Sequence, residues 1–268
     1  MDRTNIEDAK VPVKEFTLPR GFLLADEGET FVLNRAEVRE MTGYEEDIIA
    51  NDNVSFSKRM HDLVGNCLVS LSDGDGHSII DSKRLKRISG QLLMSDLMVA
   101  IFRIREATVG SEIRQRVRCP ECTNDEGKPY TWTAILNLSD FVGLPVKGDP
   151  LANVREFTTS RQNKVTWEMM TGEMELQSGK IKNARERATN ALLIRVKSFN
   201  EETDYKKIKE SLKRLSAVER QEIRRQFDSE GGIETDFECV CRNCGHEFMT
   251  TLEIGGAQFF SPFVESSD

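Results

Sequence analysis

The sequence predicts an α+β fold made of two related halves that are joined by one zinc-ribbon-like four-cysteine site. Three observations lead to this prediction. Two Cys-x-x-Cys motifs each stand between strand-like segments, amphipathic helical segments precede each motif, and the order strand, Met-Thr-Gly, acidic residue occurs twice. The predicted units are an N-terminal arm, two α+β halves and an aromatic tail, which cover residues 1–20, 21–145, 146–256 and 257–268.

The first half begins with the arm and a strand. Residues 1–20 are polar and contain two prolines, which favour an irregular arm. Residues 30–38 are strand-like, and Thr42 followed three residues later by Glu45 matches a capping box. The acidic residues that follow suit the positive end of a helix dipole, so we expect a helix to start at this point.

Two further helices are expected before the first cysteine motif. Residues 55–71 read as one helix. Residues 92–107 form the clearest helix, because apolar residues recur on one face, namely Leu93, Leu97, Ile101 and Ile104. Gly110 ends this helix, and the strand-like segments on both sides of the motif predict a β-hairpin.

The same order of elements returns in the second half. Residues 164–173 repeat strand, Met-Thr-Gly and acid, residues 188–196 form an apolar helical segment, and residues 205–227 are helical with a second capping box. The glycine of Met-Thr-Gly lies 76 residues before the first motif in one half and 69 residues before the second motif in the other. This pattern indicates a degenerate internal duplication.

The two cysteine motifs are Cys119 with Cys122 and Cys241 with Cys244. Each pair lies on a turn that can direct two sulfur atoms at one ion, and together they provide the tetrahedral four-cysteine set that Zn²⁺ prefers. We therefore predict a metal that closes a long loop and joins the two halves. Four protein ligands leave no open position for a reacting water, so the predicted zinc is structural.

Other interpretations of the cysteines stay open. The same ligands suit an iron–sulfur cluster, which is the less favoured alternative, and free thiols or disulfides are others. Six cysteines with four of them in these motifs fit a reducing compartment better than a disulfide framework. Cys239 would face the same side of its strand as Cys241, so it is either a spare thiol or a substitute ligand. Cys67 lies in an apolar segment and is expected in the core.

Composition excludes several classes of function. The chain has 268 residues, 38% of them hydrophobic, and a net charge of −8, which argues against a general nucleic-acid or anionic-membrane surface. It has no apolar run that could span a bilayer and no signal-peptide core near its first residue, so we expect folding in the cytoplasm.

No pattern indicates an enzyme or a small-molecule substrate. The three histidines lack neighbours that would complete a catalytic triad, and the chain has neither a Gly-rich phosphate loop nor a His-Glu-x-x-His motif. Arg114, Arg116 and Arg118 share one face of a predicted strand. In an acidic chain, this arginine stripe is more typical of a solvated face or of a contact with an acidic partner than of phosphate binding.

The C-terminal segment contains Phe259, Phe260 and Phe263 after a Gly-Gly pair. Two roles are open for these rings, either folding back onto the chain or anchoring a partner chain. We take the three rings as candidate partner-binding residues.

Several short segments resemble one family. The segment at 37–47, which ends in Met-Thr-Gly-Tyr-Glu-Glu-Asp, is similar to the TGxEED segment of T4-type phage baseplate hub proteins. The segments around the two cysteine motifs, at 117–122 and 237–248, resemble that family as well, as does Phe-Phe-Ser-Pro at 259–262. The resemblance covers residues 30 to 263 in order, and Cys239 departs from the family pattern.

The resemblance implies a structural or assembly component of a contractile-tail baseplate, near the central hub. Its partners would be other baseplate, hub or tail-tube proteins, and it would lie in the virion tail after assembly in the host cytoplasm. A structural zinc, which contributes on the order of 10 kcal/mol to folding, suits a particle that survives outside a cell. Two alternatives remain, a zinc-ribbon nucleic-acid-binding or transcription-associated protein that uses the arginine stripe, and a transient tail assembly chaperone absent from the particle.

Overall fold

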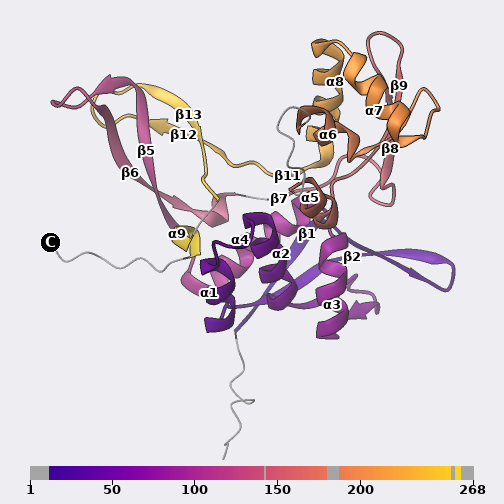
Figure 1. The fold of residues 1–268 in the computed structure, drawn as a ribbon. Coiled ribbons are helices and arrows are strands. Elements are labelled where there is room, and N and C mark those ends of the chain that lie inside the picture. The colour runs from indigo at the N-terminus through magenta and orange to yellow at the C-terminus, as the bar shows by residue number, and fades with distance from the viewer. Residues whose placement is uncertain (1–11, 142, 180–186, 255–256, 261–268) are drawn as a thin grey trace, which may run out of the picture.

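Residues 12–141, 143–179, 187–254 and 257–260 are described in the computed structural model, and they form a mixed α+β structure with several small sheets (Figure 1). The elements fall into three lobes. The base lobe comprises residues 13–109, the second lobe residues 154–227, and the metal lobe residues 112–137 together with 236–251. Each lobe has its own buried cluster of apolar side chains.

The base lobe contains a four-stranded antiparallel sheet and four α-helices. The strand order is β1 (Val13–Asp26), β2 (Glu29–Arg39), β3 (Leu68–Ser72) and β4 (Ser78–Ile79). The helices are α1 (Gly43–Ala50), α2 (Phe56–Cys67), α3 (Ser82–Ile88) and α4 (Met94–Val109). The predicted apolar face of α4 is buried and packs against β1, β2 and α2, which confirms the helical spacing seen in the sequence.

Two predictions for the base lobe were wrong. The predicted arm is a strand from Val13 onward, while residues 1–11 lie outside the described part. Pro19 fits within β1 because the pairing of β1 with β2 shifts register between Thr17 and Phe22, where no regular ladder bond is required. The predicted helix over 55–71 ends at Cys67, because the last residues pair with β2 as the strand β3.

The second lobe contains a three-stranded antiparallel sheet in the order β10 (Val196–Phe199), β9 (Lys164–Glu168) and β8 (Val154–Thr158). Its helices are α5 (Gly172–Ser178), α6 (Arg187–Leu193), α7 (Tyr205–Arg214) and α8 (Ala217–Phe227). Trp167 is almost fully buried at the centre of this lobe, against Phe227 and beneath the guanidinium of Arg195.

The helix boundaries of the second lobe differ from the prediction. The segment 188–196 is the helix α6 followed by the first residue of β10, because Val196 pairs with Trp167 of β9. The segment 205–227 is two helices, because the chain is extended at Leu215 and Ser216 begins the second helix with the predicted capping box.

The metal lobe consists of two antiparallel hairpins that lie side by side, away from the helices of the other two lobes (Figure 1). The first hairpin is β5 (Glu112–Thr123) with β6 (Pro129–Asn137), and the second is β12 (Asp236–Val240) with β13 (Glu247–Thr251). Val117, Ala134 and Cys239 are buried between the hairpins. Gln115 bridges them, because its amide donates to the Thr251 carbonyl at 2.9 Å and accepts from the Glu253 N–H at 2.7 Å.

Short elements connect the lobes. The strands β7 (Gly143–Leu144) and β11 (Gly232–Ile233) pair with each other between the metal lobe and the helices. The short helix α9 (Ala257–Phe260) returns the chain to the base lobe. Among the described residues, no helix combines the length and apolar character needed to cross a bilayer.

The base and second lobes meet at a buried polar junction. Asp96, at the start of α4, is fully buried and accepts hydrogen bonds from the backbone N–H groups of Arg20 and Gly21 at 2.8 and 3.1 Å. The guanidinium of Arg20 donates to the side chain of Asn153, just before β8. These contacts fix the bulged part of β1 against the first residues of the second lobe.

Candidate metal centre

The cysteine motifs lie at the ends of the two hairpins of the metal lobe. Cys119 and Cys122 interrupt the pairing of β5 with β6, whose register shifts between Arg118 and Thr123. The second motif forms the turn between β12 and β13. In that turn, Gly245 has a φ of +74°, and its N–H donates to the Cys241 carbonyl at 2.9 Å. A left-handed residue at this position favours glycine, which the sequence provides.

The structure brings the four predicted ligands together. The sulfur atoms of Cys119 and Cys244 are 3.7 Å apart, and those of Cys122 and Cys241 are 3.6 Å apart. All four sulfur atoms lie within 4.8 Å of one another. Zn–S bonds of about 2.3 Å in a tetrahedron place the sulfur atoms about 3.8 Å apart, so the spacing fits one zinc ion. A disulfide requires a sulfur separation of about 2.05 Å, and the four side chains are free thiols.

Hydrogen bonds to the sulfur atoms favour the charged thiolates that bind metals. The N–H groups of Glu121 and Asn243 donate to the sulfur atoms of Cys119 and Cys241, both at 3.4 Å. The side-chain amide of Asn243 also donates across the site to the Cys122 sulfur at 3.5 Å. Burial acts to raise the pKa of Cys241, but the N–H groups of Cys244 and Asn243 and the side chains of Cys244 and Cys119 outweigh it and lower this pKa to about 6. Despite the hydrogen bond from Asn243, the neighbouring sulfur atoms raise the pKa of Cys122 to about 12, so hydrogen bonds favour the thiolate most at Cys241.

The site is shielded on one side only. Cys119 and Cys241 are each 2% exposed, whereas Cys122 is half-buried and Cys244 is exposed. The two buried ligands continue the inner faces of the hairpins, which pack against each other. A bound ion would therefore extend the small apolar core of the metal lobe to its outer end.

The other two cysteines do not join the ligand set. Cys239 is buried between the hairpins, where burial raises the pKa of its thiol, so it packs as an apolar side chain. Cys67 lies in the base core as predicted, and burial raises its pKa to about 12. The ring of His246 stacks against Phe248 with centroids 5.9 Å apart and belongs to the surface of the second hairpin.

Asn243 is the site residue that sequence reasoning missed. Its position inside the second motif marks it as a turn residue. Only the folded structure shows that its amide reaches the Cys122 sulfur of the other hairpin.

The C-terminal phenylalanines occupy the first of the two roles left open by the sequence. Phe259 and Phe260 are 3% and 5% exposed inside the base core, and the ring of Phe259 packs against Phe102. The guanidinium of Arg105 donates to the Phe259 carbonyl at 3.1 Å. Both rings are buried within the chain, so the structure places them in the base core, and a role in binding a partner stays a prediction. Phe263 lies outside the described residues.

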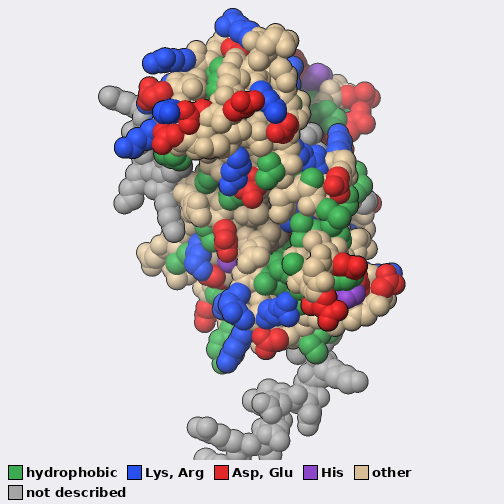
Figure 2. Space-filling model, turned by 90° about the vertical axis from the view of Figure 1, so that its right-hand side faces the viewer, with side chains coloured by type: hydrophobic (Ala, Val, Ile, Leu, Met, Phe, Trp, Pro, Cys, Tyr) green, Lys and Arg blue, Asp and Glu red, His purple; other side chains and the backbone are tan. Residues whose placement is uncertain are grey.

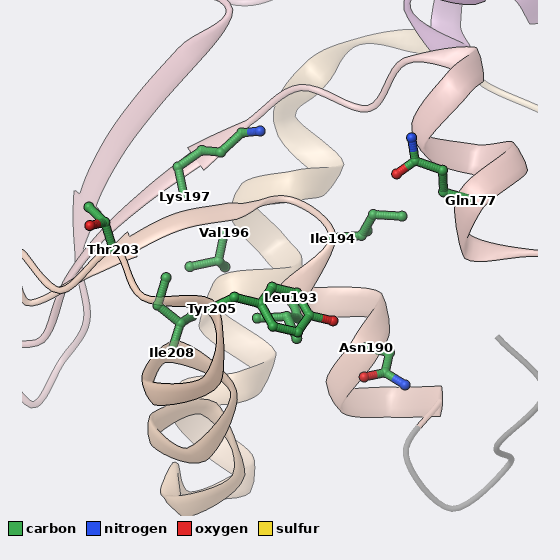
Figure 3. A pocket seen from close by; sticks show the side chains of 9 residues that line it. All are labelled: Gln177, Asn190, Leu193, Ile194, Val196, Lys197, Thr203, Tyr205 and Ile208. Carbon is green, nitrogen blue, oxygen red and sulfur yellow. The ribbon is translucent and has the colours of Figure 1, made fainter. Parts of the chain in front are cut away.

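A hollow of about 430 Å³ lies in the second lobe between α5, α6, α7 and β10 (Figure 3). Tyr205 and Leu193 line the hollow together with the polar side chains of Gln177, Asn190 and Lys197 (Figure 3). The ammonium group of Lys197 is paired with Glu168. Since its lining provides neither a nucleophile with a neighbouring base nor a set of metal ligands, we assign the hollow no chemistry.

No protein-family model, no curated protein and no solved structure matches the chain. Its function must therefore be argued from the residues and their geometry.

Proposed function

We propose that Cys119, Cys122, Cys241 and Cys244 bind one structural zinc ion that fastens the two hairpins of the metal lobe. The observation that carries this proposal is the convergence of four sulfur atoms, from two distant segments, within 4.8 Å of one another. Zinc bound there supplies a cross-link between the segments. The short separations favour a single ion over a multi-iron cluster, in which the four thiolates are divided among two or four iron atoms. X-ray absorption at the metal edge tests the proposal, with four sulfur ligands at about 2.3 Å expected for zinc.

We further propose that the base and second lobes arose by duplication of one unit. In both, a hairpin is extended by a third antiparallel strand, in the order β1-β2-β3 and β8-β9-β10. Threonine of Met-Thr-Gly caps the helix that follows the hairpin, at Thr42 and at Thr171. Aspartate caps the third helix of each lobe, at Asp81 and at Asp204.

The ends of the two units also correspond. A buried acidic residue occupies the third position of the last helix, Asp96 in α4 and Glu219 in α8. Gly110 and Gly231, with φ values of +86° and +83° and extended ψ values, follow these helices on the way to the hairpins. An experimental structure in which residues 13–109 cannot be superposed on residues 154–227 would contradict the duplication.

For the whole chain, we propose a non-enzymatic role as a structural or assembly component of a contractile-tail baseplate, near the hub. The support is the set of short segments that resemble T4-type baseplate hub proteins, together with a closed four-cysteine site that is suited to stabilising a fold. Docking to other baseplate, hub or tail-tube proteins would be the mechanism.

Mass spectrometry of purified tails from the source tests this role. Stoichiometric peptides of this chain in the particle are expected for a structural part. Peptides found in the infected-cell lysate and absent from particles would instead identify an assembly chaperone. If the chain is found with nucleic acid and never with tail proteins, the baseplate proposal fails.

The arginine stripe favours one alternative, a nucleic-acid-binding zinc ribbon. Arg114, Arg116 and Arg118 are all exposed on the outer face of β5, as that role requires. Binding to duplex DNA or RNA that weakens steeply with salt would support it, because phosphate contacts release counterions.

A further inference from the structure

The metal lobe has two outer faces of opposite charge. Side chains point alternately to the two faces of each strand. In β5, the residues that alternate with the buried ones therefore point away from the second hairpin. In β12 and β13, the exposed residues likewise point away from the first hairpin. The outer face of the first hairpin is the basic face, which carries the arginine stripe. The outer face of the second hairpin is the acidic face, which carries Asp236, Glu238 and Glu247.

Four of the charged side chains on these faces have no ion-pair partner among the described residues. Arg114 pairs with Glu112, but Arg116 and Arg118 form no ion pair with any described residue. Glu238 and Glu247 likewise lack a basic partner within the described ranges. This separation differs from the face shown in Figure 2, where basic and acidic side chains of the described residues are interspersed.

Each face also exposes apolar side chains beside its charges. Ile135, directly opposite Arg114 in the first hairpin, is 57% exposed. In the second hairpin, Val240 lies opposite Glu247 and Met249 opposite Glu238, and they are 54% and 63% exposed. Each face therefore combines exposed apolar side chains with charged ones, and the charges of the two faces have opposite signs.

We propose that the metal lobes of two copies of this chain stack head to tail, with the basic face of one copy against the acidic face of the next. Two identical faces would place like charges together, which excludes a symmetric face-to-face dimer through either face. A head-to-tail contact leaves one free face of each sign, so it extends into a ring or an open array.

The size of the faces sets the expected strength of the contact. The acidic face spans five residues of each strand, so it is about 17 Å long and about 10 Å wide and covers about 170 Å². Stable interfaces bury about 800 Å² on each partner. We therefore expect the contact to be weak between free molecules, to require a high protein concentration, and to weaken as salt screens the exposed charges.

Two charge-reversal variants test the proposal by sedimentation velocity on the full zinc-loaded chain. R116E/R118E makes both outer faces acidic, and E238K/E247K makes both basic. Wild type is expected to self-associate at about 0.05 M salt and to dissociate at about 0.5 M salt. Each variant alone is expected to stay monomeric, and an equimolar mixture of the two to associate. The control K147E/K206E, at two exposed cations outside the metal lobe, is expected to associate like the wild type.

Zinc content and circular dichroism establish that each variant is folded, so that a loss of association reflects the faces. The proposal is overturned if the mixture associates no more than either variant alone. It is also overturned if both single-face variants associate as the wild type does, because the contact then lies elsewhere. Binding of duplex DNA by wild type that R116E/R118E abolishes, without any self-association, would assign the basic face to nucleic acid instead.

Discussion

Glu45 is a buried residue whose charge is satisfied entirely by the chain around it. It is 2% exposed and forms two hydrogen bonds with the guanidinium of Arg39, both at 3.0 Å. The N–H and hydroxyl groups of Thr42 donate to the same carboxylate at 3.0 and 2.9 Å. Burial alone would raise the pKa of Glu45, but these donors outweigh it and lower the pKa to about 2. The capping box predicts the contacts with Thr42, whereas the contacts with Arg39 depend on the fold.

Replacing Glu45 with glutamine is expected to lower the free energy of unfolding by about 2 kcal/mol at pH 7, because Arg39 loses its charged partner. The folded pKa of Glu45 lies below its ordinary value of 4.5. Its contribution is therefore complete above that value and is lost as pH falls toward 2. The difference between wild type and E45Q in urea midpoints should shrink over this range. E46Q, at an exposed neighbour, is the control, and an E45Q deficit that stays constant with pH would contradict the assignment.

Among the elements, those that depend on local signals could be predicted and those that depend on distant pairing could not. Helix α4 follows from apolar spacing, and both cysteine hairpins follow from strand-like segments around a turn. The strand β1 was missed although it forms a tight hairpin with β2, because its first residues are polar and include Pro19, which favours an irregular arm. The strand β3 was missed because it directly follows α2 and pairs with β2, about 30 residues earlier, which leaves no local signal. The cysteine pairs could be predicted from a local signal, as α4 could, because two residues between two cysteines allow both sulfur atoms to point at one ion.

The two tryptophans report separately on two lobes. Trp132 lies on β6 beside the small core of the metal lobe, and Trp167 lies in the core of the second lobe. Because these cores are separate, removing the ion with a chelator is expected to shift the emission of Trp132 to longer wavelength and to leave Trp167 unchanged. W167F and W132F isolate the two signals. A shift of the Trp167 emission on chelation would mean that the ion stabilises more than the metal lobe.

We expect the packing of helix α9 in the base core to contribute to the stability of the fold. Truncating Phe259 to alanine removes a buried ring, so F259A should lower the free energy of unfolding by about 3 kcal/mol. F56A, at a ring that is 36% exposed on α2, is the matched control and should cost much less. Equal urea midpoints for F259A and wild type would show that the ring contributes no packing energy.

At the scale of the whole molecule, the chain consists of two α+β lobes with separate cores, and the hairpin that follows each lobe contributes half of the four-cysteine cluster. The sequence predicts the mixed α+β class and the four ligands. It does not predict that the two hairpins leave their own lobes to form a third, because this depends on packing between segments that are far apart in the chain. The buried faces around Val117 and Cys239 hold the hairpins together, and the ion would fasten their outer ends.

The most direct test of the central claim is the metal content of the protein purified under reducing conditions without chelator, measured by inductively coupled plasma mass spectrometry. We expect one zinc per chain in wild type and in C239A, because Cys239 packs in the core and is outside the ligand set. We expect C244S, which removes the most exposed ligand, to lose most of its zinc. Wild-type protein with neither zinc nor iron, or full zinc retention in C244S, would contradict the proposed four-cysteine site.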